Sequence, residues 1–165
     1  GLGDVYKRQL MAEALAWAKE NNMSFLEMLQ DIYLKYGFSR EEGISVVRPG
    51  KTGADEIVAM MKNFRANPHK SLGGSPVVTI KDYSDLNCTD VQTGKVEKMD
   101  FPTTSNVLQY FTADGSKISI RPSGTEPKIK FYIEVRGTMN SKADYAEAIK
   151  AAEAKTEMIK KELGI

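Results

Sequence analysis

The most regular alternation of apolar and polar residues lies between Lys128 and Arg136. Its apolar positions are Ile129, Phe131, Ile133 and Val135. A period of two places these side chains on one face of a β-strand and the intervening polar side chains on the other. The segment is therefore predicted to be a strand with one buried face.

Two extended runs precede this strand, at Asn106–Thr112 and Ser116–Arg121. Asp114 and Gly115 lie between them, and an Asp-Gly dipeptide between extended runs is a strong signal for a hairpin. We expect the two runs to pair antiparallel. Strands are also predicted at Ile44–Val47 and Ser75–Tyr83, and residues 86–102 form a polar stretch in which Asp90–Lys95 has the composition of a hairpin tip.

Apolar residues recur at helical spacing in four other segments. These predicted helices are Leu10–Glu20, Ser24–Gly37, Thr52–Phe64 and a long helix that begins near Ser141. The last three each open with the spacing of a capping box, as Ser24/Glu27, Thr52/Asp55 and Ser141/Asp144. We expect the first side chain of each pair to cap its helix.

The order of elements from Ile44 onward is β-α-β-β-β-β-α, which predicts an α+β fold with a mostly antiparallel sheet and helices on one face. The two earlier helices have no strand of their own, so residues 10–40 are expected to be the helical tail of a preceding domain and residues 44–165 a domain of their own. Residues 1–9 lack apolar periodicity and are interpreted as a cloning remnant.

Composition narrows the function classes. The chain has 165 residues and 41% hydrophobic content, with 23 Lys and Arg against 22 Asp and Glu, a net charge of +1. This balance gives no indication of a nucleic-acid or membrane-surface protein. The single cysteine, Cys88, excludes an internal disulfide and a cysteine-based zinc cluster. Because no signal-peptide pattern or membrane-spanning stretch is found either, we expect a cytoplasmic protein.

No metal or catalytic residue is predicted. His69, the only histidine, lies between Pro68 and Lys70 without a carboxylate or cysteine at ligand spacing, and is interpreted as a surface loop residue. The acidic residues Asp82 and Asp85 are better explained as strand-end and turn residues than as cation ligands.

The segment Arg121–Lys128 joins two predicted strands and has the residue types that a phosphate site requires. An arginine offers a bidentate fork to phosphate oxygens, hydroxyl groups offer neutral donors, and a glycine lets backbone N–H groups approach an anion. The candidate phosphate-binding residues are Arg121, Ser123, Gly124, Thr125 and Lys128. On these grounds alone, an ordinary turn between two strands is an equally good explanation.

The complete sequence of the loop and the strand after it favours a phosphate site over an ordinary turn. Arg-Pro-Ser-Gly-Thr-Glu-Pro-Lys, followed by Ile-Lys-Phe-Tyr-Ile-Glu-Val, closely resembles the phosphate-binding loop and next strand in the fourth domain of the α-D-phosphohexomutase superfamily, most of all its phosphoglucomutase-like branch. Further segments that resemble this family are Ser24–Gly37, Leu72–Gly74, Lys81–Tyr83 and Thr104–Leu108.

This resemblance implies a C-terminal phosphoglucomutase/phosphomannomutase domain of the TATA-box-binding-protein-like fold. The implied enzyme interconverts sugar 1-phosphate and 6-phosphate through a phosphoserine and a bisphosphate intermediate, and this loop holds the phosphate that is not reacting. The implied partners are a phosphosugar and the upstream domains of the same enzyme. Mg²⁺ and a glucose 1,6-bisphosphate-type activator would belong to the full-length enzyme.

No segment of the chain matches the family's serine, metal or sugar-recognition loops, so the chain alone is expected to be inactive and to bind no cofactor. Within the family, a phosphomannomutase, phosphopentomutase or amino-sugar phosphomutase is the alternative. Outside it, the alternative is a non-catalytic module that binds a phosphorylated partner.

Overall fold

The computed structural model describes residues 2–165, which form two compact units. The first unit comprises residues 2–38 and 137–149, and the second comprises residues 39–136 and 150–165. No helix in the described residues is long and apolar enough to cross a membrane.

The first unit contains α1 (Leu2–Glu20), α2 (Phe25–Tyr36), the short 3-10 helix η1 (Lys142–Asp144) and the start of α4 (Tyr145–Leu163). The capping box predicted before α2 is confirmed, because the Glu27 backbone N–H donates to Ser24 Oγ at 3.1 Å and the Ser24 N–H donates to Glu27 Oε2 at 2.7 Å. The Ser141/Asp144 box is also present, on η1.

Helix α1 begins at Leu2, well before the predicted Leu10. Asp4 lies in its first turn, where a carboxylate is favourable because the N-terminal end of a helix carries partial positive charge. The absence of an apolar stripe in residues 2–9 therefore did not prevent helix formation. Whether these residues are a cloning remnant stays a prediction.

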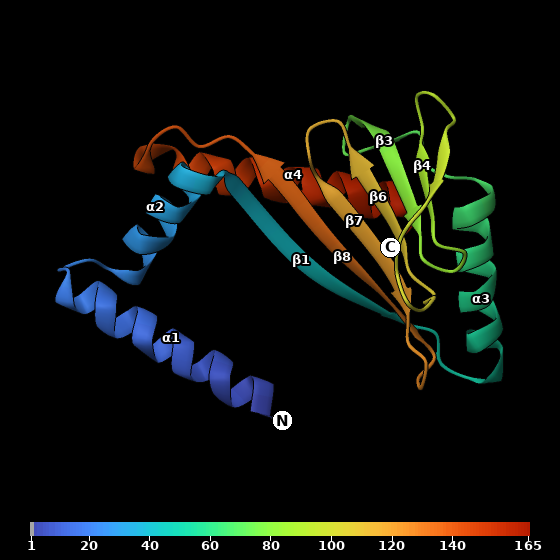
Figure 1. The fold of residues 1–165 in the computed structure, drawn as a ribbon, viewed down its shortest axis with the longest axis horizontal. Coiled ribbons are helices and arrows are strands. Elements are labelled where there is room, and N and C mark those ends of the chain that lie inside the picture. The colour runs from blue at the N-terminus through green and yellow to red at the C-terminus, as the bar shows by residue number, and fades with distance from the viewer. Residues whose placement is uncertain (1) are drawn as a thin grey trace. The chain divides into compact units, whose positions relative to one another are not determined.

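The second unit is built on an eight-stranded sheet (Figure 1). Its strands run in the spatial order β1-β8-β7-β6-β3-β4-β5, with the two-residue strand β2 beside β3. The bounds are β1 (Phe38–Val47), β2 (Ser71–Leu72), β3 (Ser75–Asp82), β4 (Asn87–Asp90), β5 (Val96–Lys98), β6 (Leu108–Thr112), β7 (Lys117–Pro122) and β8 (Lys128–Gly137).

The predicted antiparallel sheet is confirmed. Each of the pairs β7–β8, β6–β7, β3–β6, β3–β4 and β4–β5 is antiparallel. The polar stretch 86–102 contains the β4–β5 hairpin, and its tip closes with the Thr93 backbone N–H donating to Asp90 Oδ1 at 2.8 Å. Strand β1 is longer than the predicted Ile44–Val47, since it begins at Phe38.

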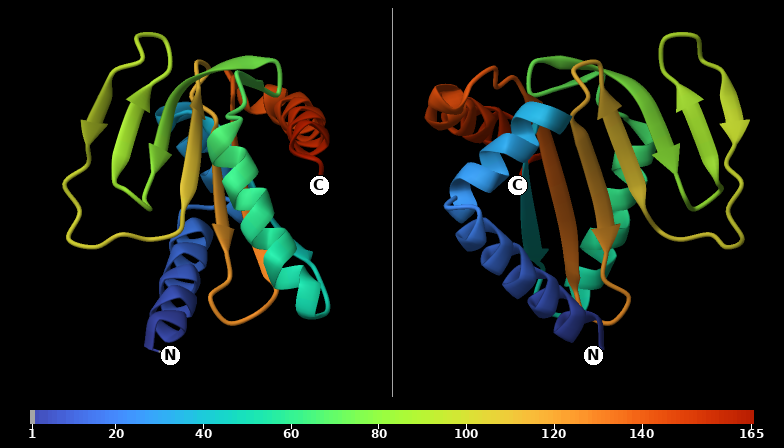
Figure 2. Two further views of the ribbon diagram at one scale, coloured as in Figure 1. Left: turned by 90° about the vertical axis from the view of Figure 1, so that its right-hand side faces the viewer. Right: turned by 60° about the vertical axis from the view of Figure 1, so that its left-hand side comes forward.

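One face of the sheet carries the core. Ile118, Ile120, Phe131 and Ile133 are fully buried, as the period-two pattern predicted for the last two. Helix α3 (Lys51–Ala66) covers this face (Figure 2). The Phe64 ring of this helix lies 6.1 Å from the Phe131 ring. An ion pair between Arg65 Nε and Asp82 Oδ2, 2.7 Å apart, joins the helix to β3.

The N-terminus of α3 differs from the prediction. No side chain caps this helix; Gly50 is its N-cap residue, with a φ of 94° that favours glycine. Because the helix already begins at Lys51, Thr52 lies inside the first turn and its hydroxyl cannot serve as the cap. The predicted Thr52/Asp55 capping box is therefore wrong.

His69 is also more enclosed than predicted. Its ring lies 6.0 Å from the Tyr110 ring in an edge-to-face arrangement and 6.1 Å from the Phe64 ring. Tyr110 itself is fully buried and donates its hydroxyl to the Phe64 carbonyl oxygen at 2.8 Å. His69 thus packs on the aromatic part of the core rather than lying free on the surface.

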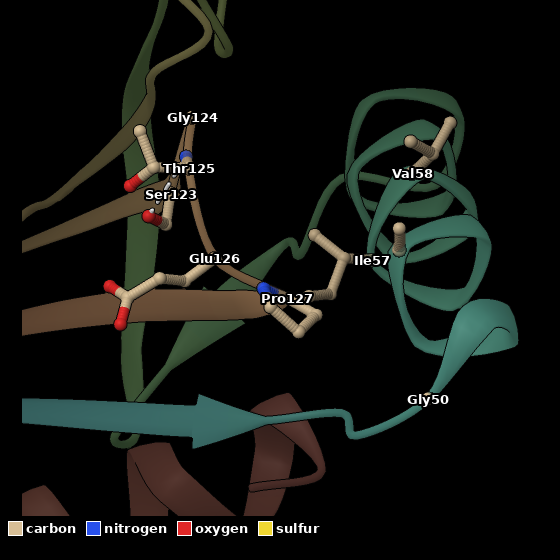
Figure 3. A pocket seen from close by; sticks show the side chains of 9 residues that line it. Gly50, Ile57, Val58, Ser123, Gly124, Thr125, Glu126 and Pro127 are labelled. Carbon is tan, nitrogen blue, oxygen red and sulfur yellow. Dashed lines mark hydrogen bonds between the residues drawn. The ribbon is translucent and has the colours of Figure 1, made fainter.

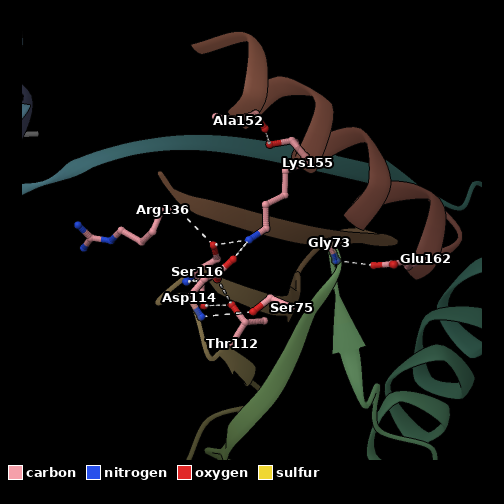
Figure 4. Close-up of polar contacts among 10 residues, drawn as sticks. Gly73, Ser75, Thr112, Asp114, Ser116, Arg136, Ala152, Lys155 and Glu162 are labelled. Carbon is pink, nitrogen blue, oxygen red and sulfur yellow. Dashed lines mark hydrogen bonds and ion pairs between the residues drawn. The ribbon is translucent and has the colours of Figure 1, made fainter. Parts of the chain in front are cut away.

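Residues 150–163 of α4 are held to the sheet by polar contacts at the β6–β7 turn and at the β2–β3 turn (Figure 4). The Lys155 ammonium pairs with the Asp114 carboxylate and donates to Ser116 Oγ at 3.2 Å. The Gly73 backbone N–H donates to Glu162 Oε2 at 2.7 Å. Asp114 is thus a turn residue, as predicted, and also an anchor for the last helix.

Candidate functional site

The loop between β7 and β8 is held in shape by backbone hydrogen bonds. The Ser123 N–H donates to the Lys128 carbonyl oxygen at 2.8 Å, and the Lys128 N–H donates to the Glu126 carbonyl oxygen at 2.7 Å. The Arg48 N–H, just after β1, donates to the Pro127 carbonyl oxygen at 2.9 Å. These bonds fix both arms of the loop, so a ligand would meet a preformed turn.

A cavity of about 360 Å³ opens beside this loop and brings several cations together. It is lined by Arg121, Pro122, Ser123, Gly124, Thr125, Glu126, Lys128 and Lys130. All the phosphate-binding residues predicted from the sequence therefore line one cavity. Its lining carries three cationic side chains against one carboxylate, a balance that attracts an anion.

Lys130 was not among the predicted residues. In the β7–β8 ladder it lies directly opposite Arg121, so both side chains emerge on the same face of the sheet. The signal was present in the sequence, because Lys128 and Lys130 share the polar face of an alternating strand. Only the pairing register shows that this face also carries Arg121.

Arg121 is distinguished by having no partner within the described residues. Its side chain makes no hydrogen bond or ion pair there, whereas Arg40, Arg48, Arg65 and Arg136 each pair with a carboxylate. Arg121 is also exposed. All of its guanidinium donors are therefore available to a ligand.

Glu126 partly neutralises the site. Its carboxylate pairs with the Lys128 ammonium, and the hydrogen bond and charge of Lys128 lower the pKa of Glu126 below its ordinary value. The Glu126 side chain is 59% exposed, whereas Lys128 is 25% exposed. Among the described residues, Glu126 is thus the group that pairs with the Lys128 ammonium.

Ser123, Gly124 and Thr125 form the tip of the loop. The Thr125 N–H lies 3.4 Å from Ser123 Oγ, a long contact, and a Cβ added at Gly124 would meet no atom within 4 Å. The fold therefore does not itself require glycine at this position. What a side chain at residue 124 would obstruct is the approach of a ligand to the backbone N–H groups.

The other side of the loop faces α3. A second cavity, about 460 Å³, lies between residues 123–127 and the helix side chains Ala54, Ile57 and Val58 (Figure 3). The Glu126 side chain points away from this helix. Because the described residues that line the helix side of this cavity are apolar and include no cation, an anion is favoured on the Arg121 side.

A metal site was not predicted for this chain. Among residues 2–165, no group of three or more His, Cys, Asp and Glu side chains is arranged to hold a metal ion.

Comparison with known proteins agrees with the resemblance. Residues 73–152, which include the whole loop, match the family model of the phosphoglucomutase/phosphomannomutase C-terminal domain. The phosphoglucomutase of Staphylococcus saprophyticus is 35% identical over 116 residues, which are 70% of this chain and 21% of that protein. The phosphoglucomutase of Staphylococcus haemolyticus is 31% identical over 117 residues, 71% of this chain and 21% of that protein.

This chain thus spans about a fifth of the length of these relatives. Among solved structures, the open form of parafusin (pp63), a phosphoglucomutase from Paramecium, matches 82% of this chain and 23% of its own, with 19% identity and a TM-score of 0.42. A similarity at that level adds no argument about function.

Proposed function

Because this chain contains, at residues 73–152, a domain of the phosphoglucomutase/phosphomannomutase C-terminal family, we propose that its β7–β8 loop binds the phosphate group of a phosphosugar. Arg121 supplies the bidentate charge clamp, and Lys128 and Lys130 add positive charge. The Ser123 and Thr125 hydroxyls and the backbone at Gly124 supply neutral donors.

The observation that carries the proposal is the unpaired guanidinium of Arg121 directly opposite Lys130. A charge-assisted hydrogen bond contributes roughly 1.5–3 kcal/mol, so three or four of them give about millimolar affinity or better. An affinity in this range suits a domain that holds and releases a substrate phosphate. Binding of this kind needs no reactive group.

In the full-length protein, we expect this grip to serve a phosphosugar mutase. The loop would hold the non-reacting phosphate while phosphoryl transfer occurs at a phosphoserine outside this chain, with Mg²⁺ and a sugar bisphosphate activator bound there as well. These residues would then orient the phosphosugar by holding its non-reacting phosphate, which lowers the entropic cost of the reaction. The cytoplasmic location also stays a prediction.

The test is an amide NMR titration of this chain with inorganic phosphate and, separately, with glucose. Phosphate should shift the resonances of residues 121–130, and glucose alone should not. Arg121→Ala should weaken phosphate binding by about tenfold or more, and Arg121→Lys should restore only part, because an ammonium cannot reproduce the bidentate fork.

Arg8→Ala is the matched control. Arg8 is an exposed arginine on α1 whose Nε donates to the Asp4 carbonyl oxygen at 3.2 Å, so its loss removes the same charge outside the loop. If both alanine variants bind phosphate as the unmodified chain does, or if no resonance of the loop responds to phosphate, the proposal is wrong.

A further inference from the structure

The face of the sheet opposite the core carries a row of polar side chains beside the loop. In the strand ladders, Gln109 lies opposite Ser119, and Ser119 lies opposite Tyr132. Arg121 is two residues from Ser119 along β7, so it emerges on this same face. The row of polar side chains and Arg121 therefore lie next to each other on one face of the sheet.

A cavity of about 590 Å³ lies over this row. It is lined by Glu41, Glu42, Gly43, Gln109, Lys117, Ser119, Arg121, Tyr132, Ile133 and Glu134. Arg121 lines both this cavity and the smaller one at the loop. The two cavities therefore meet at Arg121, so a ligand whose phosphate is held by the loop can reach the larger cavity.

Tyr132 is the aromatic group in this cavity. Its side chain is 45% exposed although it lies in the middle of β8, where its neighbours Phe131 and Ile133 are fully buried. A Cβ added at Gly43 would lie 3.7 Å from the Tyr132 ring. Because residue 43 is glycine, no side chain from this position covers the ring, and its apolar face can receive a ligand.

The polar groups around the ring are held in place by one another. Gln109 Nε2 donates to Ser119 Oγ at 2.9 Å, and the Tyr83 hydroxyl donates to Gln109 Oε1 at 3.1 Å. The Glu134 carboxylate, which is nearly buried, is bound by Lys117 Nζ at 2.7 Å and Arg136 at 2.8 Å. Fixed donors and acceptors beside an exposed ring form a preorganised site.

The chemistry of this face selects among ligand classes. Carboxylates at Glu41, Glu42 and Glu134 disfavour a polyanion such as a nucleic acid. The many polar groups disfavour a large apolar surface. A neutral sugar ring meets both requirements, because its C–H face can lie on an aromatic ring while its hydroxyl groups hydrogen-bond to amide, hydroxyl and carboxylate groups.

We propose that Tyr132 is the platform for the hexose ring of the phosphosugar, with Gln109, Ser119 and Glu134 facing its hydroxyl groups. The proposal rests on the proposed function of the loop, since the phosphate anchors the ligand at Arg121. Diagonal neighbours across antiparallel strands, such as Arg121 and Tyr132, are about 7–8 Å apart at their backbones. This spacing suits a phosphate joined directly to a hexose.

The experiment compares three ligands of the unmodified chain by NMR titration: inorganic phosphate, glycerol 3-phosphate and glucose 6-phosphate. Glycerol 3-phosphate is a phosphate monoester without a ring. Glucose 6-phosphate should bind about fivefold more tightly than glycerol 3-phosphate, a gain typical of one aromatic contact. It should also give nuclear Overhauser effects between Tyr132 ring protons and sugar C–H protons.

Tyr132→Thr keeps a good strand former at a half-exposed position and should abolish this fivefold difference without changing the affinity for inorganic phosphate. Tyr6→Thr, on α1, is the matched control and should leave the difference intact.

Equal affinities for the two monoesters in the unmodified chain, with shifts confined to the loop, would overturn the role of Tyr132 and leave the phosphate site standing. Failure of all three ligands to bind would overturn the phosphate site, and this proposal with it.

Discussion

Arg121 and Lys130 lie directly opposite each other in the β7–β8 ladder. Two like charges in a cross-strand pair destabilise a sheet, typically by a few tenths of a kcal/mol to about 1 kcal/mol. Glu126 offsets this only in part, because its carboxylate is paired with Lys128. The pair costs the fold stability, and a bound phosphate would remove that cost by supplying the missing negative charge.

Replacing Lys130 separates these two effects. Lys130→Thr should raise the free energy of unfolding by up to about 1 kcal/mol, because it removes the repulsion and keeps a good strand former. It should also weaken phosphate binding by about fivefold. Urea denaturation and a phosphate titration on one variant measure both, and a variant that loses stability would contradict this account of the pair.

The Glu126 carboxylate should weaken phosphate binding. Its carboxylate occupies Lys128 and repels an incoming anion, so Glu126→Gln should strengthen phosphate binding by about threefold at low salt, and by less at high salt. Glu97→Gln is the matched control, since Glu97 pairs with Lys95 at 2.5 Å in an ion pair of the same sequence separation, away from the loop. Weaker binding by the Glu126 variant would mean that this carboxylate helps to build the site.

Alanine substitution at two glycines should affect different properties of the protein. A Cβ at Gly53 would overlap the Arg48 backbone carbonyl, whereas a Cβ at Gly124 meets nothing within 4 Å. Gly53→Ala should therefore lower the free energy of unfolding by about 2 kcal/mol or more, because helix α3 must move. Gly124→Ala should leave the melting temperature unchanged and weaken phosphate binding. Thermal unfolding followed by circular dichroism, with the phosphate titration, distinguishes the two.

The Asp114–Lys155 contact should make the fold sensitive to acid. Burial alone would raise the pKa of Asp114, but hydrogen bonds from Lys155, Thr112 and Ser116 outweigh it, so that the pKa lies well below its ordinary value. The stabilisation is thus complete above the pKa of the unfolded chain, about 4, and is lost as pH falls through the lower folded-state value.

Asp114→Asn should accordingly cost roughly 1 kcal/mol of unfolding free energy at pH 7, a modest figure because the Asp114 side chain is 39% exposed. The difference from the unmodified chain should shrink as the pH is lowered below about 4. Denaturant unfolding at a series of pH values measures this, and a difference that stays constant down to pH 2 would rule out the ionised carboxylate as its source.

Local sequence patterns were sufficient to predict most of the secondary structure. The alternation in β8 and the Asp-Gly turn between β6 and β7 depend on neighbouring residues alone, and so do the capping boxes at Ser24 and Ser141. The start of α3 was predicted wrongly, since the left-handed backbone at Gly50 sets it rather than a side-chain cap. A spacing rule for side chains cannot detect that backbone geometry.

The sequence by itself determined the residue types of the loop and their resemblance to a phosphohexomutase. This was possible because a phosphate-binding site needs particular side chains within a short turn. Only the tertiary structure decided which other groups join them. Strand register set Lys130 against Arg121 and aligned Gln109, Ser119 and Tyr132 on one face. The packing of the whole chain left Arg121 without a carboxylate partner in the described residues, since such pairing depends on contacts between residues distant in sequence.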